Sequence, residues 1–394
     1  MSRSPFLPPS RRRSREAARR RRRRQRRRAL VGIAFAAIVA ALAYVVLAHG
    51  ATSPEHGGSA ATHTRDAARG KRRGADSSRA GLAASAGAPR PSSGISGTAT
   101  GSPGDGPGLS PAGFPLGQPS LPLNLADPAA DPLHLGFPEP PRAGIVIDLD
   151  SGRVLWRRNP LTRLRIASLT KMMTALLTVK STPPDARVLI TKQAEETSGS
   201  KVGVLPLGRR VPLTPLLYGL LLPSGNDAAV ALAQHVAGTV HRFVGEMNEE
   251  AARLGLGCTH YSSPSGFYNT HNYSCAADLA ELASIDLRQP RIAQVTRTRA
   301  AILPFPIKGG KLYLYNNNPL LIYGYPGTTG MKTGETIEAG RCLVATAARD
   351  GVRLAVVLLH SPAPGTQARD LLNDAFQNVY HLRPVAEPPM PPGA

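Results

Sequence analysis

The interpretation of this chain of 394 residues depends on three short stretches: Ser168-Leu169-Thr170-Lys171, Ser224-Gly225-Asn226 and Lys332-Thr333-Gly334. Each of them is common by chance. A second serine stands three residues before a lysine in Ser198-Gly199-Ser200-Lys201, within a polar, Gly-containing stretch that no helix pattern follows. The informative observation is therefore the ordered set, with each member in a fitting local context.

The first stretch pairs a serine with a lysine on one predicted helix, Ala167 to Val179, where positions i and i+3 share a face. Serine is a weak nucleophile without an adjacent base. Lysine can be that base only if desolvation or a nearby positive charge, here Lys332, destabilises its ammonium form. The backbone N–H of Ser168, at the opening of the helix, can face an oxyanion. Taken alone, the same residues would form an ordinary first helical turn.

The second stretch follows Pro223, which ends a predicted helix, and turns into the next helix. A turn between helices can project polar side chains into a cleft. We expect Ser224 to relay a proton between Lys171 and a leaving group. Asn226 offers a donor and an acceptor to a substrate peptide bond. Helix capping by Ser224 or Asn226 is the simpler alternative.

The third stretch lies on a predicted strand. Lys332 and Thr333 supply a cation and a hydroxyl suited to holding a carboxylate, and Gly334 lets a substrate backbone approach this edge as an added strand. The N–H of Glu335 can complete an oxyanion hole with that of Ser168. A surface strand with an exposed lysine is the alternative.

Hydrophobic periodicity predicts the order strands, helices, strands, helix. The predicted strands are Ala143–Asp148, Arg153–Trp156, Leu312–Tyr315, Thr329–Lys332, Cys342–Ala347 and Leu354–Leu359. Further helices are predicted at Pro215–Leu222, Asp227–Ala237, Val240–Leu254, Cys275–Leu287 and Thr366–Val379. This order predicts an α+β fold, an antiparallel sheet flanked by helices, formed by the two chain ends with a helical lobe inserted between them.

The N-terminal part has a different composition. Residues 1–28 hold 14 arginines and one glutamate, and Ala29–Ala48 is an uncharged run of 20 residues. At ~1.5 Å per residue this run spans a bilayer core, so we expect a single-pass transmembrane helix in the cell membrane, with the arginines cytoplasmic and the rest extracytoplasmic. A cleaved signal peptide is the alternative. A nucleic-acid partner is not expected, because no aromatic residues interleave the arginines.

Three further segments complete the predicted domain organisation. Residues 49–142 are rich in Gly, Ser, Ala and Pro and predict a disordered linker. Residues 143–383 form the expected catalytic domain, and residues 384–394 form a Pro-rich tail.

The region from Ala143 to Tyr380 resembles the D-alanyl-D-alanine carboxypeptidases, the low-molecular-mass penicillin-binding proteins. The stretches that carry the resemblance are Ser168–Thr174, Leu217–Ala229 and Lys332–Thr336, with Phe243-Val244, Met247-Asn248, Leu254–Leu256 and Asp278–Ala280 in the helical lobe. The resemblance implies a β-lactamase/DD-peptidase-like fold. Two residues depart from the family pattern: Ile166 stands where many members have proline, and Glu335 stands where an aromatic, His or small residue is familiar.

The resemblance also implies a mechanism. Ser168, activated by Lys171, attacks the carbonyl of the penultimate D-alanine of a peptidoglycan stem peptide, and water then hydrolyses the acyl-enzyme. Lys332 and Thr333 would bind the terminal carboxylate, which β-lactams mimic. No metal and no organic cofactor is implied, and we expect a monomer.

Three other functions compete with this one. Class A β-lactamases share the three motifs but deacylate through a Glu-x-x-Leu-Asn loop, and no such pentapeptide occurs between Asn226 and Lys332. Endopeptidase or transpeptidase activity at the same site stays open. The complete serine–lysine–serine–lysine set argues against a non-catalytic wall-binding protein.

The three cysteines allow one disulfide in an oxidising compartment. Cys258 and Cys275 bracket 16 residues and form the plausible pair, whereas Cys342 lies in an apolar, buried strand. Zinc binding by Cys258, His260, His271 and Cys275 is the alternative.

Overall fold

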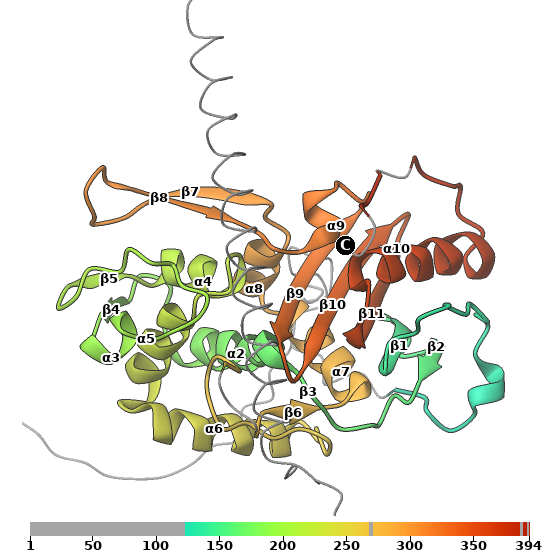
Figure 1. Ribbon diagram of the computed structural model, residues 1–394, viewed down its shortest axis with the longest axis horizontal. Coiled ribbons are helices and arrows are strands. Elements are labelled where there is room, and N and C mark those ends of the chain that lie inside the picture. Colours follow the sequence, from blue (N-terminus) through green and yellow to red (C-terminus); the bar gives the residue numbers. More distant parts are fainter. Residues whose placement is uncertain (1–122, 268–270, 387–388, 392–393) are drawn as a thin grey trace, which may run out of the picture. The chain divides into compact units, whose positions relative to one another are not determined.

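The computed structural model describes residues 123–267, 271–386, 389–391 and 394 (Figure 1). The predicted basic segment, the predicted transmembrane helix and most of the predicted linker lie outside these residues. Within the described residues, no helix combines the length and the apolar character needed to cross a membrane. The anchor therefore stays a prediction.

A five-stranded antiparallel sheet forms the centre of the described region, with strand order β2-β1-β11-β10-β9. The strands are β1 (Ala143–Asp148), β2 (Val154–Arg158), β9 (Thr328–Thr336), β10 (Gly340–Arg349) and β11 (Val352–Ser361). The first strands of this region pair with its last strands, as predicted, since β1 lies beside β11 along its whole length. The prediction that the chain ends build one antiparallel sheet is confirmed.

Helices fill most of the chain between β2 and β9. They are α2 (Lys171–Ser181), α3 (Lys192–Glu195), α4 (Leu213–Leu221), α5 (Asn226–Ala237), α6 (Val240–Arg253), α7 (Ala276–Leu287), α8 (Pro290–Thr296) and α9 (Pro319–Ile322), and α10 (Pro364–Asp374) follows the sheet. Three small antiparallel pairs join them: β3 (Leu164–Arg165) with β6 (Tyr273–Ser274), β4 (Arg187–Leu189) with β5 (Arg210–Pro212), and β7 (Ala300–Pro304) with β8 (Lys311–Tyr315). This is the predicted inserted helical lobe.

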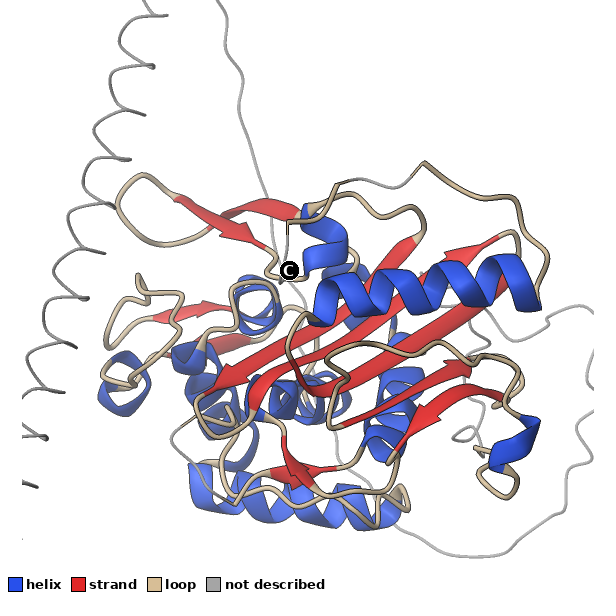
Figure 2. Cartoon of the chain, turned by 45° about the vertical axis from the view of Figure 1, so that its right-hand side comes forward, coloured by secondary structure: helices blue, strands red, loops and turns tan. Residues whose placement is uncertain are grey.

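Both faces of the sheet are covered. In β1, Ile145 and Ile147 join the large core that includes the helical lobe, whereas Val146 joins a smaller core with α10. Figure 2 shows α10 lying across this second face. Successive strand residues point to opposite faces, so a strand buried on both faces needs a continuous apolar run. The central strands therefore show no polar–apolar alternation.

The secondary structure of the first motif, Ser168 to Lys171, differs from the prediction. A single helix from Ala167 was expected, but Ala167–Thr170 is a 3₁₀ turn, η2, and α2 begins at Lys171. Ala167 has a positive φ of 47°. This backbone conformation is uncommon for a residue other than glycine and cannot belong to an α-helix. Ser168 thus sits on a turn that precedes the buried helix carrying Lys171.

The folded region also begins earlier than predicted. The last part of the predicted linker, residues 123–142, packs against β2. Leu133 is buried, and its N–H donates to the Leu155 carbonyl at 3.0 Å. Arg157 Nε donates to Asp131 Oδ2 at 2.6 Å, with a second contact from Nη2 to Oδ1 at 2.5 Å. The boundary at residue 142 was therefore wrong, because scattered apolar and charged residues in a Pro-rich segment give no periodic signal. In the predicted tail, Met390 packs against the smaller core.

The Asp131–Arg157 pair provides a test of this extension. Replacing Asp131→Ala leaves a buried guanidinium without its carboxylate, so we expect the free energy of unfolding to fall by about 3 kcal/mol. Asp150→Ala is the matched control, because it breaks a more exposed pair with Arg353 and should cost about 1 kcal/mol or less. Urea unfolding of both variants measures the difference, and equal losses would contradict the packed segment.

Candidate active site

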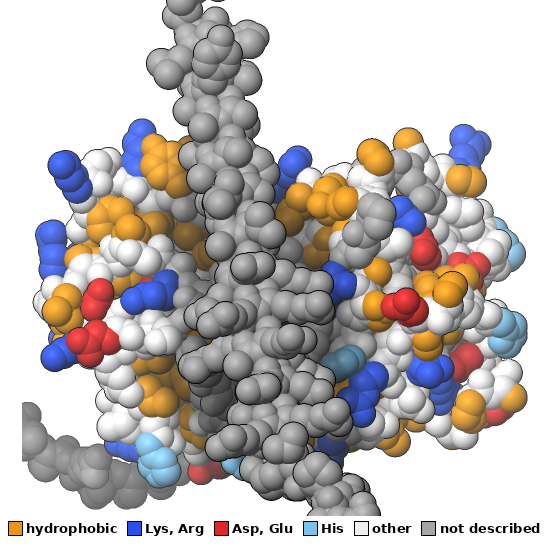
Figure 3. Space-filling model, viewed as in Figure 1, with side chains coloured by type: hydrophobic (Ala, Val, Ile, Leu, Met, Phe, Trp, Pro, Cys, Tyr) orange, Lys and Arg blue, Asp and Glu red, His pale blue; other side chains and the backbone are white. Residues whose placement is uncertain are grey.

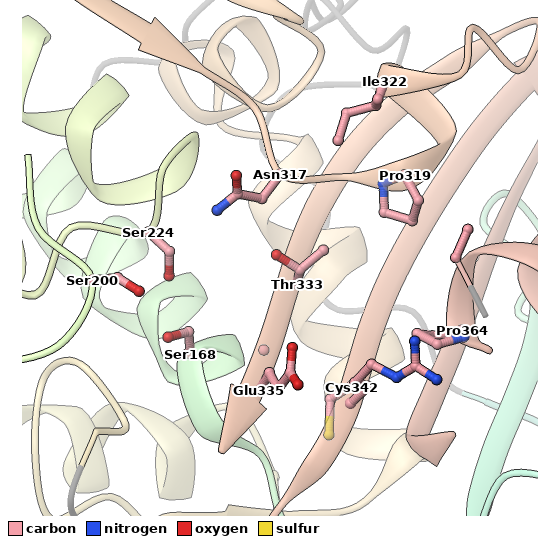
Figure 4. Close-up of a pocket in the computed structure, with 13 residues that line it drawn as sticks. Ser168, Ser200, Ser224, Asn317, Pro319, Ile322, Thr333, Glu335, Cys342 and Pro364 are labelled. Carbon is pink, nitrogen blue, oxygen red and sulfur yellow. The ribbon is translucent and has the colours of Figure 1, made fainter. Parts of the chain in front are cut away.

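The three motifs meet at one cavity of about 400 Å³, between η2, the α4–α5 turn and β9 (Figure 4). Ser168, Ser224, Thr333, Gly334 and Glu335 line it. In Figure 4, Ser168 and Ser224 lie on one side of the cavity and Thr333 on the other. Three further predicted residues, Lys171, Asn226 and Lys332, are buried. The structure therefore brings all eight predicted site residues together.

The Lys171 side chain makes three hydrogen bonds within the site. It is 0% exposed, and its Nζ donates to Ser168 Oγ at 2.9 Å, Asn226 Oδ1 at 2.7 Å and the Ser265 carbonyl at 2.9 Å. An ammonium has three N–H donors, so these three acceptors satisfy the charged form completely. Once it has lost a proton, the same amine can accept the Ser168 hydroxyl proton.

Burial and charge both favour the neutral amine. Desolvation lowers the pKa of Lys171 well below its usual value, the positive charge of Lys332 lowers it further, and Asp227 acts in the opposite direction. Burial also lowers the pKa of Lys332, to about 7. The expectation that desolvation and a second cation would make Lys171 a base agrees with this arrangement.

Both the oxygen and the nitrogen of the Asn226 side chain make hydrogen bonds within the protein. Its Oδ1 accepts from Lys171, its Nδ2 donates to the Ser198 carbonyl at 2.8 Å, and its backbone N–H donates to the Ser200 carbonyl at 2.7 Å. Gly199 has φ +88°, and a Cβ there would lie 2.6 Å from Asn226 Nδ2. The Ser198–Lys201 stretch therefore holds Asn226 through backbone carbonyls, a supporting role that its sequence did not indicate.

Ser224 is the residue with an unused polar group. It has a positive φ of 67°, and its Oγ is buried with no hydrogen-bond partner in the described part of the chain. Gly225 is the N-cap residue of α5, and no side chain caps that helix. The capping alternative is thus excluded for Ser224. Ser224 lines the cavity, so its hydroxyl is placed to bond to a group that enters the cavity.

The third motif packs directly onto the first. A Cβ at Gly334 would lie 2.8 Å from the Ile166 carbonyl oxygen and 3.1 Å from Ser168 N. Glycine is therefore required by the close approach of two backbones, in addition to the substrate approach that the sequence suggested. Lys332 Nζ donates to the Thr333 carbonyl at 2.8 Å. Glu335 is exposed beside the cavity and pairs across the sheet with Arg341, which also lines it.

One loop of the site was missed by sequence reasoning. It supplies the Ser265 carbonyl to Lys171, and its Asn272 donates to Thr170 Oγ1 at 2.9 Å, beneath η2. Gly266 has φ +74°, and a Cβ there would lie 1.9 Å from the Ala167 carbonyl oxygen. The loop thus holds the turn that carries Ser168. Only the Ser- and Gly-rich stretch Ser262–Gly266 hinted at it, because its contribution is mostly backbone.

Two of the three cysteines, Cys258 and Cys275, flank this loop in the sequence. All three are unbonded, so the predicted disulfide is not present, but the Cys258 and Cys275 sulfurs lie within 4.8 Å of each other and of an Asp278 carboxylate oxygen. The predicted zinc set is not assembled: His260 stacks on Tyr273 instead, and neither it nor His271 belongs to this group. Cys342 is buried, as expected.

The thiol pair generates a prediction. On oxidation, Cys258 and Cys275 close a loop of 16 intervening residues, which should stabilise the protein by about 3 kcal/mol. Oxidised, denatured protein should contain one titratable thiol and reduced protein three, and oxidation should raise Tm. Cys258→Ser should abolish the Tm difference, whereas Cys342→Ser should keep it. Three thiols after oxidation would exclude the disulfide.

Comparison with known proteins agrees with this geometry. The model of the D-alanyl-D-alanine carboxypeptidase family matches residues 141–363. The chain is similar to D-alanyl-D-alanine carboxypeptidase DacF of Bacillus subtilis, with 33% identity over 252 residues, covering 62% of this chain and 64% of that protein. It is 37% identical over 223 residues to DacB2 of Mycobacterium tuberculosis, covering 56% of this chain and 75% of that protein.

The solved structures show the same likeness. The S96A mutant of the Streptomyces K15 DD-transpeptidase superposes with a TM-score of 0.57 and 33% identity, covering 61% of this chain and 99% of that one. Residues 141–363, which the family model matches, contain the sheet, the helical lobe and all three motifs. The chain belongs to the D-alanyl-D-alanine carboxypeptidase family.

Proposed function

We propose that this protein is a serine-type D-alanyl-D-alanine carboxypeptidase that removes the terminal D-alanine of peptidoglycan stem peptides and is acylated by β-lactams. The observation that carries the proposal is the 2.9 Å contact between Ser168 Oγ and the buried Nζ of Lys171. The chain spans about two thirds of the Bacillus relative, so the activity of the whole protein is proposed from the site and the family.

Acylation uses the Lys171–Ser168 pair. The neutral amine accepts the Ser168 hydroxyl proton while Oγ attacks the carbonyl carbon of the penultimate D-alanine. The backbone N–H groups of Ser168 and Glu335 are the proposed oxyanion donors; the position of Gly334, against Ser168 N, supports this pairing. Ser224, whose hydroxyl has no protein partner, is the proposed relay that carries the proton to the departing D-alanine nitrogen.

Recognition of the terminal carboxylate is assigned to β9. Thr333 offers its hydroxyl at the cavity, and Lys332 lies buried behind it with a lowered pKa. A bound carboxylate favours the charged form of Lys332. Substrate binding would therefore increase the fraction of Lys332 that carries a positive charge beside the carboxylate. The same charge would favour the neutral form of Lys171.

The proposed location is the outer side of the cell membrane. Support comes from the sequence: 14 arginines precede an uncharged run of 20 residues, and a Gly- and Pro-rich stretch then leads to the folded region. The peptidoglycan substrate lies on that side. A monomer is proposed, because residues of one chain line the whole described cavity.

The nucleophile is tested by mass spectrometry. Incubation with benzylpenicillin should add one acyl group on Ser168, and the enzyme should release D-alanine from a D-Ala-D-Ala peptide. Ser168→Ala should lose both, whereas Ser198→Ala, which changes the other serine that precedes a lysine by three residues, should retain both. An adduct on the Ser168→Ala variant would refute the assignment.

The fate of the acyl group on Ser168 distinguishes the competing activities. Rapid loss of the adduct would indicate a β-lactamase. Transfer of the acyl group to an added amine, in preference to water, would indicate a transpeptidase, the activity that the Streptomyces structure is named for.

The role of Lys332 in setting the pKa of Lys171 is tested by pH dependence. The rate of penicillin acylation should rise with pH as Lys171 loses its proton. Lys332→Met removes a positive charge that lowers the pKa of Lys171, so the pH of half-maximal rate should move upward. Lys332→Arg keeps the charge and should leave that pH nearly unchanged. An unshifted profile for Lys332→Met would contradict the coupling.

A further inference from the structure

The β7–β8 hairpin has two apolar faces. Leu312 and Leu314 point into the core and are each 3% exposed, whereas Ile302, Tyr313 and Tyr315 are 62%, 56% and 66% exposed. An antiparallel pair with one face on the core is expected to carry polar residues on the other face. The outer face of this hairpin departs from that expectation.

The strand register makes these residues one surface. Ala300 lies opposite Tyr315, Ile302 opposite Tyr313, and Pro304 opposite Lys311. Directly paired residues project from the same face of a sheet. We call Ala300, Ile302, Pro304, Tyr313 and Tyr315 the hairpin face. Figure 3 shows hydrophobic side chains gathered over this hairpin, with lysine or arginine side chains at its edge.

A neighbouring loop extends the apolar surface. Arg209 Nη1 donates to the Pro306 carbonyl near the hairpin tip at 3.2 Å. This contact brings the preceding loop beside the hairpin, and its Val204 and Leu207 are also exposed. A contiguous exposed apolar patch marks an interaction surface more often than scattered apolar residues do.

The charge of this segment has one sign. Residues 297–315 contain Arg297, Arg299, Lys308 and Lys311 and no Asp or Glu. Lys308 lies in the hairpin tip and Lys311 begins β8, and both are exposed. Cations around an apolar, tyrosine-bearing face are the composition of segments that lie in a membrane interface, where tyrosine rings sit at the headgroup level and Lys or Arg attract anionic lipids.

We propose that the hairpin face is a membrane-contact surface that seats the domain on an anionic lipid bilayer. The occupant is a bilayer rather than a soluble polyanion, because a polyanion would satisfy the cations and leave Ile302, Tyr313 and Tyr315 in water. A second copy of this chain is disfavoured, since self-association would bring two sets of like charges together.

Such a contact would orient the active site. β8 runs directly into Asn317 and Pro319, which line the cavity (Figure 4). Asn317 is also fixed by its N–H, which donates to the Leu222 carbonyl at 3.2 Å. Seating the hairpin on lipid would therefore set the height and tilt of the cavity above the bilayer. The inference stands independently of which acyl substrate the cavity takes.

The test uses the full-length protein and its single tryptophan. Trp156 is buried in the core, so a tryptophan introduced at the hairpin face gives a separate signal. Tyr313→Trp protein is reconstituted in phosphatidylglycerol vesicles with brominated acyl chains. Ile337→Trp is the matched control, because Ile337 is 97% exposed in the β9–β10 turn. Retained penicillin binding shows that each variant is folded.

We expect the fluorescence added by Tyr313→Trp to be quenched roughly twofold or more by brominated anionic lipid, and that added by Ile337→Trp to be unchanged. Zwitterionic vesicles should quench less, and Lys308→Glu with Lys311→Glu should reduce quenching in anionic vesicles. Equal quenching of the two reporters, or none, would overturn the proposal. A lipid-independent response to a soluble polyanion, or to protein concentration, would assign the face to those partners instead.

Discussion

The site depends on keeping the Lys171 amine out of water while it contacts Ser168. Complete burial lowers the pKa of Lys171, and Lys332 lowers it further. The three acceptors around Nζ keep the side chain in place in its charged form. A solvated lysine at the same distance from Ser168 would remain protonated near neutral pH and could not accept the serine proton.

Each layer of the fold contributes to that burial. The α2 helix is apolar around most of its circumference and occupies the middle of the large core, so Lys171 in its first turn is enclosed from the start. β9 packs against η2 at Gly334, where a side chain would collide with the backbone. The loop that contains Ser265 covers another side of the Lys171 amine, and its Gly266 packs against the Ala167 carbonyl. These two glycines allow three backbone segments to meet around one amine.

The sequence predicted the sheet, the main helices and the eight site residues because their signals are local. Apolar runs identify β1, β10 and β11, and the motifs identify Ser168, Ser224 and Lys332. The loop that supplies Ser265 was not predictable, since a backbone carbonyl can come from any residue type. Likewise, the support of Asn226 by Ser198 and Ser200 depends on contacts between segments about 28 residues apart. The packing of residues 123–142 was not predicted either, because a Pro-rich extended segment shows no hydrophobic periodicity.

The most direct test of this account is the titration of the Lys171 side chain itself. NMR of protein carrying ¹³C-labelled lysine side chains, with the signal assigned through Lys171→Arg, reports the protonation of each amine. The account predicts that the pKa of Lys171 lies well below ~10.4, the ordinary value for a lysine side chain in water. Titration of Lys171 at that ordinary value would contradict it, because the amine would then be charged near neutral pH and unable to activate Ser168.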